Sequence, residues 1–305
     1  MKITLIYNAA AGSEEQLTAD QIAALIRRAG HELVRQTMDK ADWPEALSGP
    51  VDLVAVAGGD GTVGAVAKAL AGKAGAIAVL PLGTANNIAT TLGIMNRPVE
   101  ELIVEWTQAR HISFDIGSAT GPWGSTAFIE GFGLGLFSET MARLHAKGTD
   151  HLSHLDDTQI KITSVWEMIK DRLRGYRAKR LKVSLDGHDA SGDYILLEAM
   201  NIRFIGPNLH LAPNADPGDG MLDIALISSA NASDLNRYFS EAVESKHPQQ
   251  GWPVRRARRI DIEWDGFSVH IDDQDWPGKD GKPPAPPAAI TITTGEQKID
   301  FVAPG

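Results

Sequence analysis

Cysteine is absent from the 305-residue chain. The protein therefore has no disulfide framework, no thiolate zinc site and no thiol nucleophile, and this composition fits a reducing compartment. We expect a cytoplasmic protein for this reason.

Long apolar runs and a net positive charge are also absent. No segment approaches the roughly 18 uninterrupted apolar residues that cross a bilayer. The apolar stretch at residues 3–7 ends at Asn8, short of the roughly 7–15 residues of a signal-peptide core. The formal net charge of -10 argues against general attraction to nucleic acid, and contact with an anionic membrane would need a local basic patch.

The residue types that are present indicate a globular protein with two domains. Apolar residues make up 43% of the sequence and charged residues 22%, as in ordinary folded chains. A chain of this length exceeds what a single core usually organises.

Residues 1–110 alternate between strand-like and helix-like patterns. Helical patterns occupy residues 17–29 and 63–70, and apolar strand patterns occupy residues 2–8, 32–38, 53–57 and 76–80. This alternation is typical of a parallel sheet, in which ligands bind outside the carboxyl ends of the strands. We predict an α/β domain over residues 1–120.

The pattern changes after about residue 110. Apolar residues at helical spacing predict a helix over residues 157–174. Alternating residues predict a mostly antiparallel sheet with strands at residues 180–185, 193–201, 221–227, 260–264 and 289–293. We expect a second domain over residues 121–291, with the segment from about 292 to 305 returning to the first.

A glycine-rich loop, GGDGT at residues 58–62, follows a buried strand pattern and precedes a helical one. Glycines let backbone N–H groups converge on a phosphate, and the N-terminus of the next helix adds partial positive charge. Asp60 is the unusual member, because a carboxylate beside phosphates needs a cation between them or a hydroxyl to deprotonate. It suggests Mg²⁺ binding or general-base catalysis.

Two further loops, YNAAAG at residues 7–12 and LPLGTANN at residues 80–87, also end short apolar strands. Gly59, Gly61 and Gly64 match the dinucleotide-binding fingerprint as well, which requires an acidic residue about 20 positions later. Residues 61–99 contain no Asp or Glu, so this interpretation is disfavoured, and two loops on neighbouring strands can instead clamp a nucleotide polyphosphate.

With later motifs added, the chain resembles the diacylglycerol kinase catalytic-domain superfamily. This superfamily includes sphingosine and ceramide kinases and bacterial soluble lipid kinases, with the NAD kinases as more distant relatives. The matching motifs follow the order of the family: NAAAG at 8–12, GGDGT at 58–62, PLGTANN at 81–87, FDIG at 114–117, EGFGLG at 130–135, NADPGDGMLD at 214–223 and HIDDQ at 270–274. GGDGT and PLGT at this spacing are the specific part, and the later motifs are individually weak.

The resemblance implies an N-terminal α/β nucleotide-binding domain, a C-terminal antiparallel β-sandwich, and transfer of the γ-phosphoryl group of ATP, with Mg²⁺, to a lipid hydroxyl. The acceptor would be diacylglycerol, a sphingoid base or ceramide. A structural Mg²⁺ site is assigned to Asp219. Contacts to the nucleotide are assigned to the three loops: Asn8, Gly58, Gly59, Gly61, Thr62, Gly83, Thr84, Asn86 and Asn87.

Three departures from the family pattern bear on catalysis. Asn87 stands where the family usually has Asp, Glu130 replaces an Asn, and Asp273 and Gln274 replace the Gly and Glu of a late Asp-Gly-Glu. That Glu is a candidate general base in bacterial members, and an amide cannot take up a proton. The candidate catalytic positions are therefore Asp60, as the first substitute, then Asp272 or Asp275, and Gln274 itself.

Two alternatives to an active lipid kinase remain open at this point. One is a catalytically impaired regulator that binds nucleotide or lipid, and the other is a NAD kinase-like enzyme. An extended match to lipid kinases in the C-terminal half disfavours the second.

The resemblance also implies a lipid substrate at a membrane surface, peripheral contact with the inner face of the membrane and, as in many bacterial relatives, a homodimer. Basic residues gather at 170–180 and 255–259, where they can attract anionic lipid, although a solvated surface is their commoner role. A histidine-containing segment is predicted to be a polar surface loop and not a metal site: His145, His151 and His154.

Overall fold

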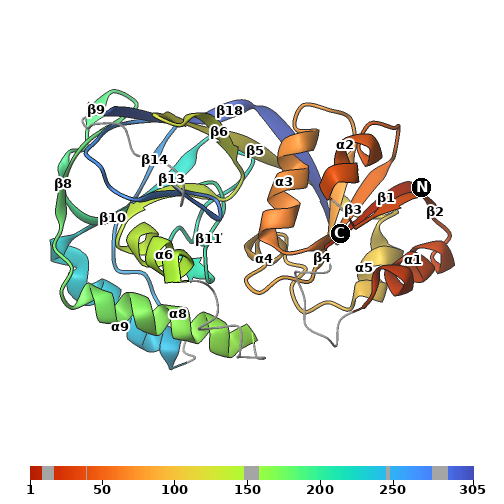
Figure 1. Ribbon diagram of the computed structural model, residues 1–305, viewed down its shortest axis with the longest axis horizontal. Helices are drawn as coiled ribbons and strands as arrows, with labels where there is room; N and C mark the ends of the chain where they lie inside the picture. Colours follow the sequence, from red (N-terminus) through yellow and green to blue (C-terminus); the bar gives the residue numbers. More distant parts are fainter. Residues whose placement is uncertain (9–16, 39, 148–157, 245–247, 277–287) are drawn as a thin grey trace. The chain divides into compact units, whose positions relative to one another are not determined.

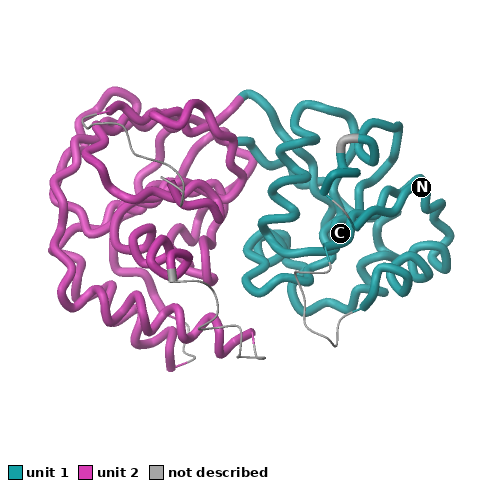
Figure 2. Tube along the Cα trace, viewed as in Figure 1, with its two compact units in different colours: residues 1–116, 296–305 teal, residues 117–295 magenta. Residues whose placement is uncertain are grey.

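The structure is a computed structural model that describes residues 1–8, 17–38, 40–147, 158–244, 248–276 and 288–305. These residues form two compact units, residues 1–116 with 296–305 and residues 117–295 (Figure 2). Two long strands, β5 (Arg110–Gly121) and β18 (Ala288–Ala303), each continue from one unit into the other. The first unit is therefore assembled from two separate parts of the sequence.

A parallel sheet forms the centre of the first unit, in the order β2–β1–β3–β4–β18. The strands besides β18 are β1 (Lys2–Tyr7), β2 (Glu32–Thr37), β3 (Leu53–Gly58) and β4 (Ala76–Pro81). Every residue of β3 is buried, as expected of a central strand covered on both faces.

The helices of the first unit follow the strands in sequence (Figure 1). They are α1 (Ala19–Arg28), α2 (Trp43–Ala46), α3 (Asp60–Leu70), α4 (Asn87–Thr91) and α5 (Val99–Glu105), with a 3₁₀ turn, η2 (Lys40–Asp42). A capping box starts α1, because Thr18 and Gln21 each accept the backbone N–H of the other. Helices α3 and α4 begin soon after β3 and β4, so their N-termini lie at the carboxyl ends of central strands.

The second unit is an antiparallel β-sandwich. One layer contains β7 (Gly131–Gly135), β10 (Gly192–Met200), β13 (Leu222–Ser228), β14 (Val254–Ala257), β16 (Val269–Ile271) and β17 (Gln274–Trp276). The other contains β5, β6 (Gly124–Phe128), β8 (Lys179–Leu185), β9 (His188–Asp189), β15 (Arg259–Trp264) and β18. A buried apolar core joins the layers and includes Phe128, Phe132, Leu197, Ile262 and Ile290.

Three helices give the second unit a further layer (Figure 1). They are α6 (Leu136–Lys147), α8 (Thr158–Leu173) and α9 (Ala232–Val243), and a second core contains Phe137, Ile169, Leu196, Ile227 and Phe239. The remaining elements are the small strands β11 (Phe204–Ile205) and β12 (Leu209–His210) and the 3₁₀ turn η3 (Ser229–Asn231). The apolar face predicted for residues 157–174 is therefore a packing surface of α8.

The predicted fold class is confirmed, and each predicted strand or helix has a counterpart in the structure. One prediction was wrong: His145 lies in helix α6 and not in a loop, because apolar residues of α6 such as Phe137 pack into the second core. His151 and His154, and residues 9–12 of the first loop, lie outside the described residues. Among the helices described, none combines the length and the apolar character needed to traverse a membrane.

Candidate active site

The loops that follow β3 and β4 touch through two glycines. A Cβ atom built on Gly59 would lie 3.0 Å from the Cα atom of Gly83, and one built on Gly83 would overlap the Cα atom of Gly59. The N–H of Leu82 donates to the carbonyl of Gly58 at 3.0 Å, which extends the pairing of the two strands into their loops. Close approach of the two backbones therefore requires glycine at both positions.

Asn8 brings the end of β1 to the same place. Its Nδ2 donates to Oγ1 of Thr62, in the first turn of α3, at 2.7 Å, and its N–H donates to the carbonyl of Ala57 at 2.9 Å. A Cβ on Gly58 would lie 2.9 Å from Cβ of Thr62, so Gly58 leaves room for this side chain. The ends of three neighbouring strands, β1, β3 and β4, thus form one cluster, which we call the glycine-loop cluster.

Asp60 lies within this cluster as the first residue of α3. Its two carboxylate oxygens accept the N–H groups of Asn87 at 2.9 Å and Ile88 at 3.0 Å. These N–H groups belong to the first turn of α4, where a helix has no internal acceptors for them. Asp60 therefore holds the second loop against the first, and its role as base or metal ligand stays a prediction.

Asn86 and Asn87 shape the second loop from inside. The side chain of Asn86 accepts the N–H of Gly83 at 2.9 Å and donates to the carbonyl of Gly83 at 2.6 Å, while its backbone has φ 52°. Asn87 is buried. Gly61 and Thr84 are the exposed members of the cluster, and their contact with a nucleotide stays a prediction.

The late motif forms the β16–β17 hairpin in the second unit, with Asp272 at its turn. One carboxylate oxygen of Asp272 accepts three backbone N–H groups, at 2.8 to 3.3 Å, from residues 129–131. Asp272 is buried and adopts φ 51°, a conformation that Asp tolerates better than most residues. It thus holds the turn before β7, while Gln274 is exposed at the start of β17.

A buried pair of titratable side chains lies beside this hairpin. Nε2 of His270 is 2.8 Å from Oε2 of Glu198, and Nδ1 of His270 is 3.0 Å from the carbonyl oxygen of Asp272. A Cβ on Gly133 would overlap the Glu198 carboxylate, so this glycine leaves space for the pair.

Burial and mutual charge set the protonation of this pair. Burial raises the pKa of Glu198 by more than the nearby His270 lowers it. Burial lowers the pKa of His270, but the charge and hydrogen bond of Glu198, with the Asp272 carbonyl, outweigh burial and raise that pKa above 6.5. The folded pair therefore retains protons more strongly than the same side chains in water.

Asp219 lies apart from the glycine-loop cluster and from the β16–β17 hairpin in the sequence, in the segment before β13. Its carboxylate forms an ion pair with Arg256 of β14 and accepts the N–H of Met221 at 2.9 Å. Arg256 also lies 3.8 Å from Asp223. Burial raises the pKa of Asp223, the charge of Arg256 lowers it in part, and the charges of Asp219 and Asp216 raise it further. Within the described residues, no three His, Cys, Asp or Glu side chains are grouped to hold a metal ion. The residues around Asp219 therefore do not fit the structural Mg²⁺ site that the resemblance assigns to them.

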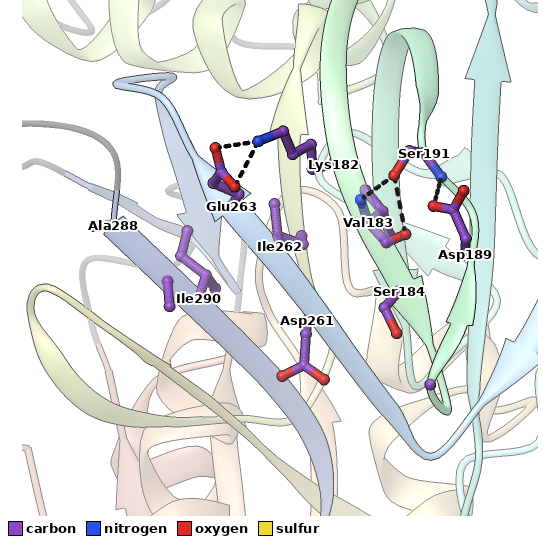
Figure 3. A pocket seen from close by; sticks show the side chains of 12 residues that line it. Lys182, Val183, Ser184, Asp189, Ser191, Asp261, Ile262, Glu263, Ala288 and Ile290 are labelled. Carbon is purple, nitrogen blue, oxygen red and sulfur yellow. Dashed lines mark hydrogen bonds and ion pairs between the residues drawn. The ribbon is translucent and has the colours of Figure 1, made fainter.

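A cavity of about 530 Å³ lies on the second unit and contains none of the predicted site residues. Figure 3 shows its floor, formed by β8, β15 and β18. Lys182 contacts both carboxylate oxygens of Glu263 at 2.9 Å, and Asp189 accepts the N–H of Ser191 at 3.0 Å. Because these polar groups are engaged with one another, we do not place the active site there.

A glycine-loop cluster on a parallel α/β sheet, followed by an antiparallel sandwich, is the arrangement that the resemblance to lipid kinases implies. Residues 2–119 match the model of the diacylglycerol kinase catalytic domain, and residues 149–293 match that of the YegS C-terminal NAD kinase beta sandwich-like domain. The chain therefore belongs to the diacylglycerol kinase family of lipid kinases, whose members transfer phosphate to a lipid.

Individual relatives agree with this assignment. The chain is 30% identical over 236 residues to a probable lipid kinase YegS-like of Cronobacter sakazakii, covering 73% of each chain. It is 26% identical over 241 residues to a diacylglycerol kinase of Mycobacterium tuberculosis, covering 74% of this chain and 72% of the relative. A putative diacylglycerol kinase from Bacillus anthracis has a similar fold, with a TM-score of 0.67 at 20% identity over 99% of this chain and 97% of that one.

Two ionic contacts to buried carboxylates were not predicted from the sequence. One is the pair of Glu198 and His270. The other is Lys298 of β18, whose Nζ lies 2.9 Å from Oδ1 of the buried Asp115 in the first unit. A charged residue inside the apolar strand β10 was a visible signal for Glu198, but its partner lies 72 positions away in the sequence.

Proposed function

We propose that this protein transfers the γ-phosphoryl group of ATP to the hydroxyl group of a membrane lipid, with diacylglycerol as the first candidate acceptor. The observation that carries this proposal is the contact between Gly59 and Gly83. It brings two strand-to-helix loops together, and such loops bind phosphate through backbone N–H groups and helix N-termini. The name diacylglycerol kinase, carried by several relatives, supports the choice of acceptor.

The residues of the cluster have separate tasks in this proposal. Gly58, Gly59 and Gly83 allow the backbone to approach the phosphates, and the hydrogen bond of Asn8 to Thr62 fixes the start of α3 beside them. Gly61 and Thr84 contact the nucleotide, while Asp60 and Asn86 hold the loops in place. ATP would supply the phosphoryl group, and Mg²⁺ bound with it would neutralise part of the phosphate charge.

A dedicated general base is not required for this chemistry. Phosphoryl transfer depends mainly on positioning and charge neutralisation, and the protein performs little covalent work. Asp272 already accepts three backbone N–H groups, and the amide of Gln274 cannot accept the proton of the lipid hydroxyl. Neither residue is therefore needed as a base in this proposal. Because positioning and charge neutralisation carry the reaction, we expect turnover with Gln274 as it stands.

We further propose that the protein meets its substrate by peripheral contact with a membrane. Lys170 and Arg174 line an open hollow between α8 and α9, together with Ser233 and Asn236, and basic side chains attract anionic headgroups. Cosedimentation with phosphatidylserine vesicles, compared with phosphatidylcholine vesicles, measures this attraction. A homodimer stays a prediction, which sedimentation velocity can decide.

The first experiment is a phosphorylation assay. Purified protein is incubated with γ-labelled ATP, Mg²⁺ and detergent-dispersed diacylglycerol, monoacylglycerol, sphingosine or ceramide, and with NAD in a separate reaction. A labelled lipid establishes the activity and identifies its acceptor. If ATP binds but no lipid is labelled, the proposal is wrong, and a labelled NAD would revive the NAD kinase alternative.

Two matched threonine variants test whether the cluster is the site. Thr62→Val removes the hydrogen bond to Asn8, and we expect kcat/KM for ATP to fall roughly tenfold, as for the loss of one hydrogen bond of about 1.4 kcal/mol. Thr4→Val is the control, because Thr4 is buried in β1 and its Oγ1 has no hydrogen-bond partner within the described residues. Equal activity of both variants and the wild type would remove Thr62 from the site.

A further inference from the structure

The segment before β13 concentrates negative charge in a short stretch of chain. Asp216, Asp219 and Asp223 fall within residues 214–223. Asp216 accepts the N–H of Gly218 at 3.1 Å and Asp219 accepts that of Met221 at 2.9 Å, so both carboxylates shape the turn itself. Asp223 is buried, with its side chain only 5% exposed. A neighbouring cation offsets the repulsion between carboxylates on so short a segment.

Arg256 supplies a cation from the neighbouring strand. The antiparallel register of β13 and β14 places Arg256 directly opposite Asp223. One end of its guanidinium group contacts Asp219, and its Nε lies 3.8 Å from Asp223. A planar guanidinium can donate to two carboxylates at once, which a lysine ammonium does less well.

The remaining contacts of the segment are provided within the second unit. Oγ1 of Thr294, on β18, donates to the carbonyl of Gly220 at 3.3 Å. Arg256 thus provides a positive charge beside Asp219 and Asp223, and Thr294 provides a donor for the backbone of the turn.

We propose that Arg256 takes the place of the structural Mg²⁺ that the family resemblance assigns to the Asp219 segment, so that the folding of this segment is independent of divalent cations. This inference concerns stability, and it does not depend on the proposed kinase reaction. It separates this chain from relatives that would need a metal ion to hold the same turn.

The test measures thermal unfolding of the whole chain without nucleotide, in EDTA and in millimolar Mg²⁺. We expect the Tm of the wild type to be the same in both. Arg256→Gln should lower the Tm in EDTA by about 2–4 °C, the shift that a loss of about 1 kcal/mol gives in a domain of this size. Mg²⁺ or Ca²⁺ should restore part of that loss, because the carboxylates of Asp219 and Asp223 are then left without the cation that contacts them.

Arg255→Gln is the matched control. Arg255 is the neighbouring residue on β14, lies opposite Ile224 and is exposed. We expect this variant to unfold like the wild type in both buffers. A cation response equal to that of Arg256→Gln would show that the effect is general and would overturn the inference.

A double variant keeps the inference testable if Arg256→Gln does not fold. Asp219→Asn combined with Arg256→Gln removes one negative charge with the positive one, so we expect recovered stability and no response to Mg²⁺. If the wild type itself is stabilised by Mg²⁺, and Asp219→Asn abolishes that stabilisation, then a metal ion binds at Asp219 and the inference is wrong.

Discussion

At the scale of single residues, Gly83 is constrained more tightly than a loop glycine usually is. We expect Gly83→Ala to lower the free energy of unfolding by about 1–3 kcal/mol, because the new methyl group would overlap the backbone at Gly59. Urea denaturation measures this change. Gly49→Ala is the control, since within the described residues a Cβ at Gly49 would meet only the end of the Arg35 side chain, at 4.0 Å. Equal stability of the two variants would mean that the loops separate readily.

The pair of Glu198 and His270 should make stability depend on pH. Both pKa values are raised in the folded protein, from 4.5 and 6.5 respectively, so the folded state binds more protons than the unfolded state. The contribution of His270 is then fully present below pH 6.5 and is lost as pH rises through its folded pKa. The free energy of unfolding should fall above pH 6.5 by up to about 1.4 kcal/mol per pH unit for one proton.

Denaturation curves recorded at roughly every pH unit from pH 6 to 9 give the free energy of unfolding of the wild type and of the double variant Glu198→Gln/His270→Asn. This double variant should show a flatter dependence on pH. His188→Gln, at an exposed position in β9, should keep the slope of the wild type. A wild-type stability that rises across this range would contradict the assigned protonation.

At the scale of secondary-structure elements, the β16–β17 hairpin depends on one carboxylate. We expect Asp272→Asn to cost about 1–2 kcal/mol of unfolding free energy, because charge-assisted hydrogen bonds to the N–H groups of residues 129–131 become neutral ones. Asparagine tolerates the positive φ at this position, so the backbone itself is not the cause. Chemical denaturation measures the loss.

The neighbouring residue of the hairpin turn offers the control for this prediction. Asp273 is exposed, and Asp273→Asn removes the same charge without removing a buried acceptor. We expect no measurable change in stability. If both variants are equally stable, Asp272 does not hold the turn, and a catalytic role for its carboxylate gains weight.

The sequence predicted the elements better than the contacts between them. The strands at 2–8, 53–57 and 76–80 could be predicted because their signals, an apolar run and the polar or glycine residues that end it, lie close together in the sequence. The capping of α4 by Asp60 could not be predicted, since its partners lie 27 and 28 positions away. The catalytic and metal roles of the candidate residues stay predictions, and the hydrogen bonds and ion pairs of these residues became visible only in the structure.

Short or isolated elements were harder to predict than long ones. Helix α4 has five residues and follows an N-cap, Asn86, in the left-handed conformation, so it is too short to show a periodic pattern. Its position is fixed by Asp60 and by the packing of Ile88, which is fully buried. Tertiary contacts determine such an element, and they leave little trace in the local sequence.

At the scale of the whole molecule, the first unit depends on the segment at residues 296–305. Phe301 of β18 is fully buried and packs on Phe114 with ring centroids 4.6 Å apart, while the neighbouring residue Asp300 pairs with Ala76 of β4. Lys298 adds its ion pair to Asp115. Contacts between distant parts of the sequence therefore complete a unit whose loops carry the candidate active site.

We expect the two units to lose their protection against amide hydrogen exchange separately when the core of one unit is weakened. Phe301→Ala should cost about 3–5 kcal/mol, as for other buried Phe→Ala changes, and native-state hydrogen exchange should show the loss in β3 and β4 before β10 and β13. Phe239→Ala, which removes an α9 side chain from the second core, is the reciprocal control and should act in the opposite order. If each variant lowers protection equally throughout the chain, the units unfold as one cooperative block, and binding at the glycine-loop cluster should then stabilise the sandwich as strongly as the α/β unit.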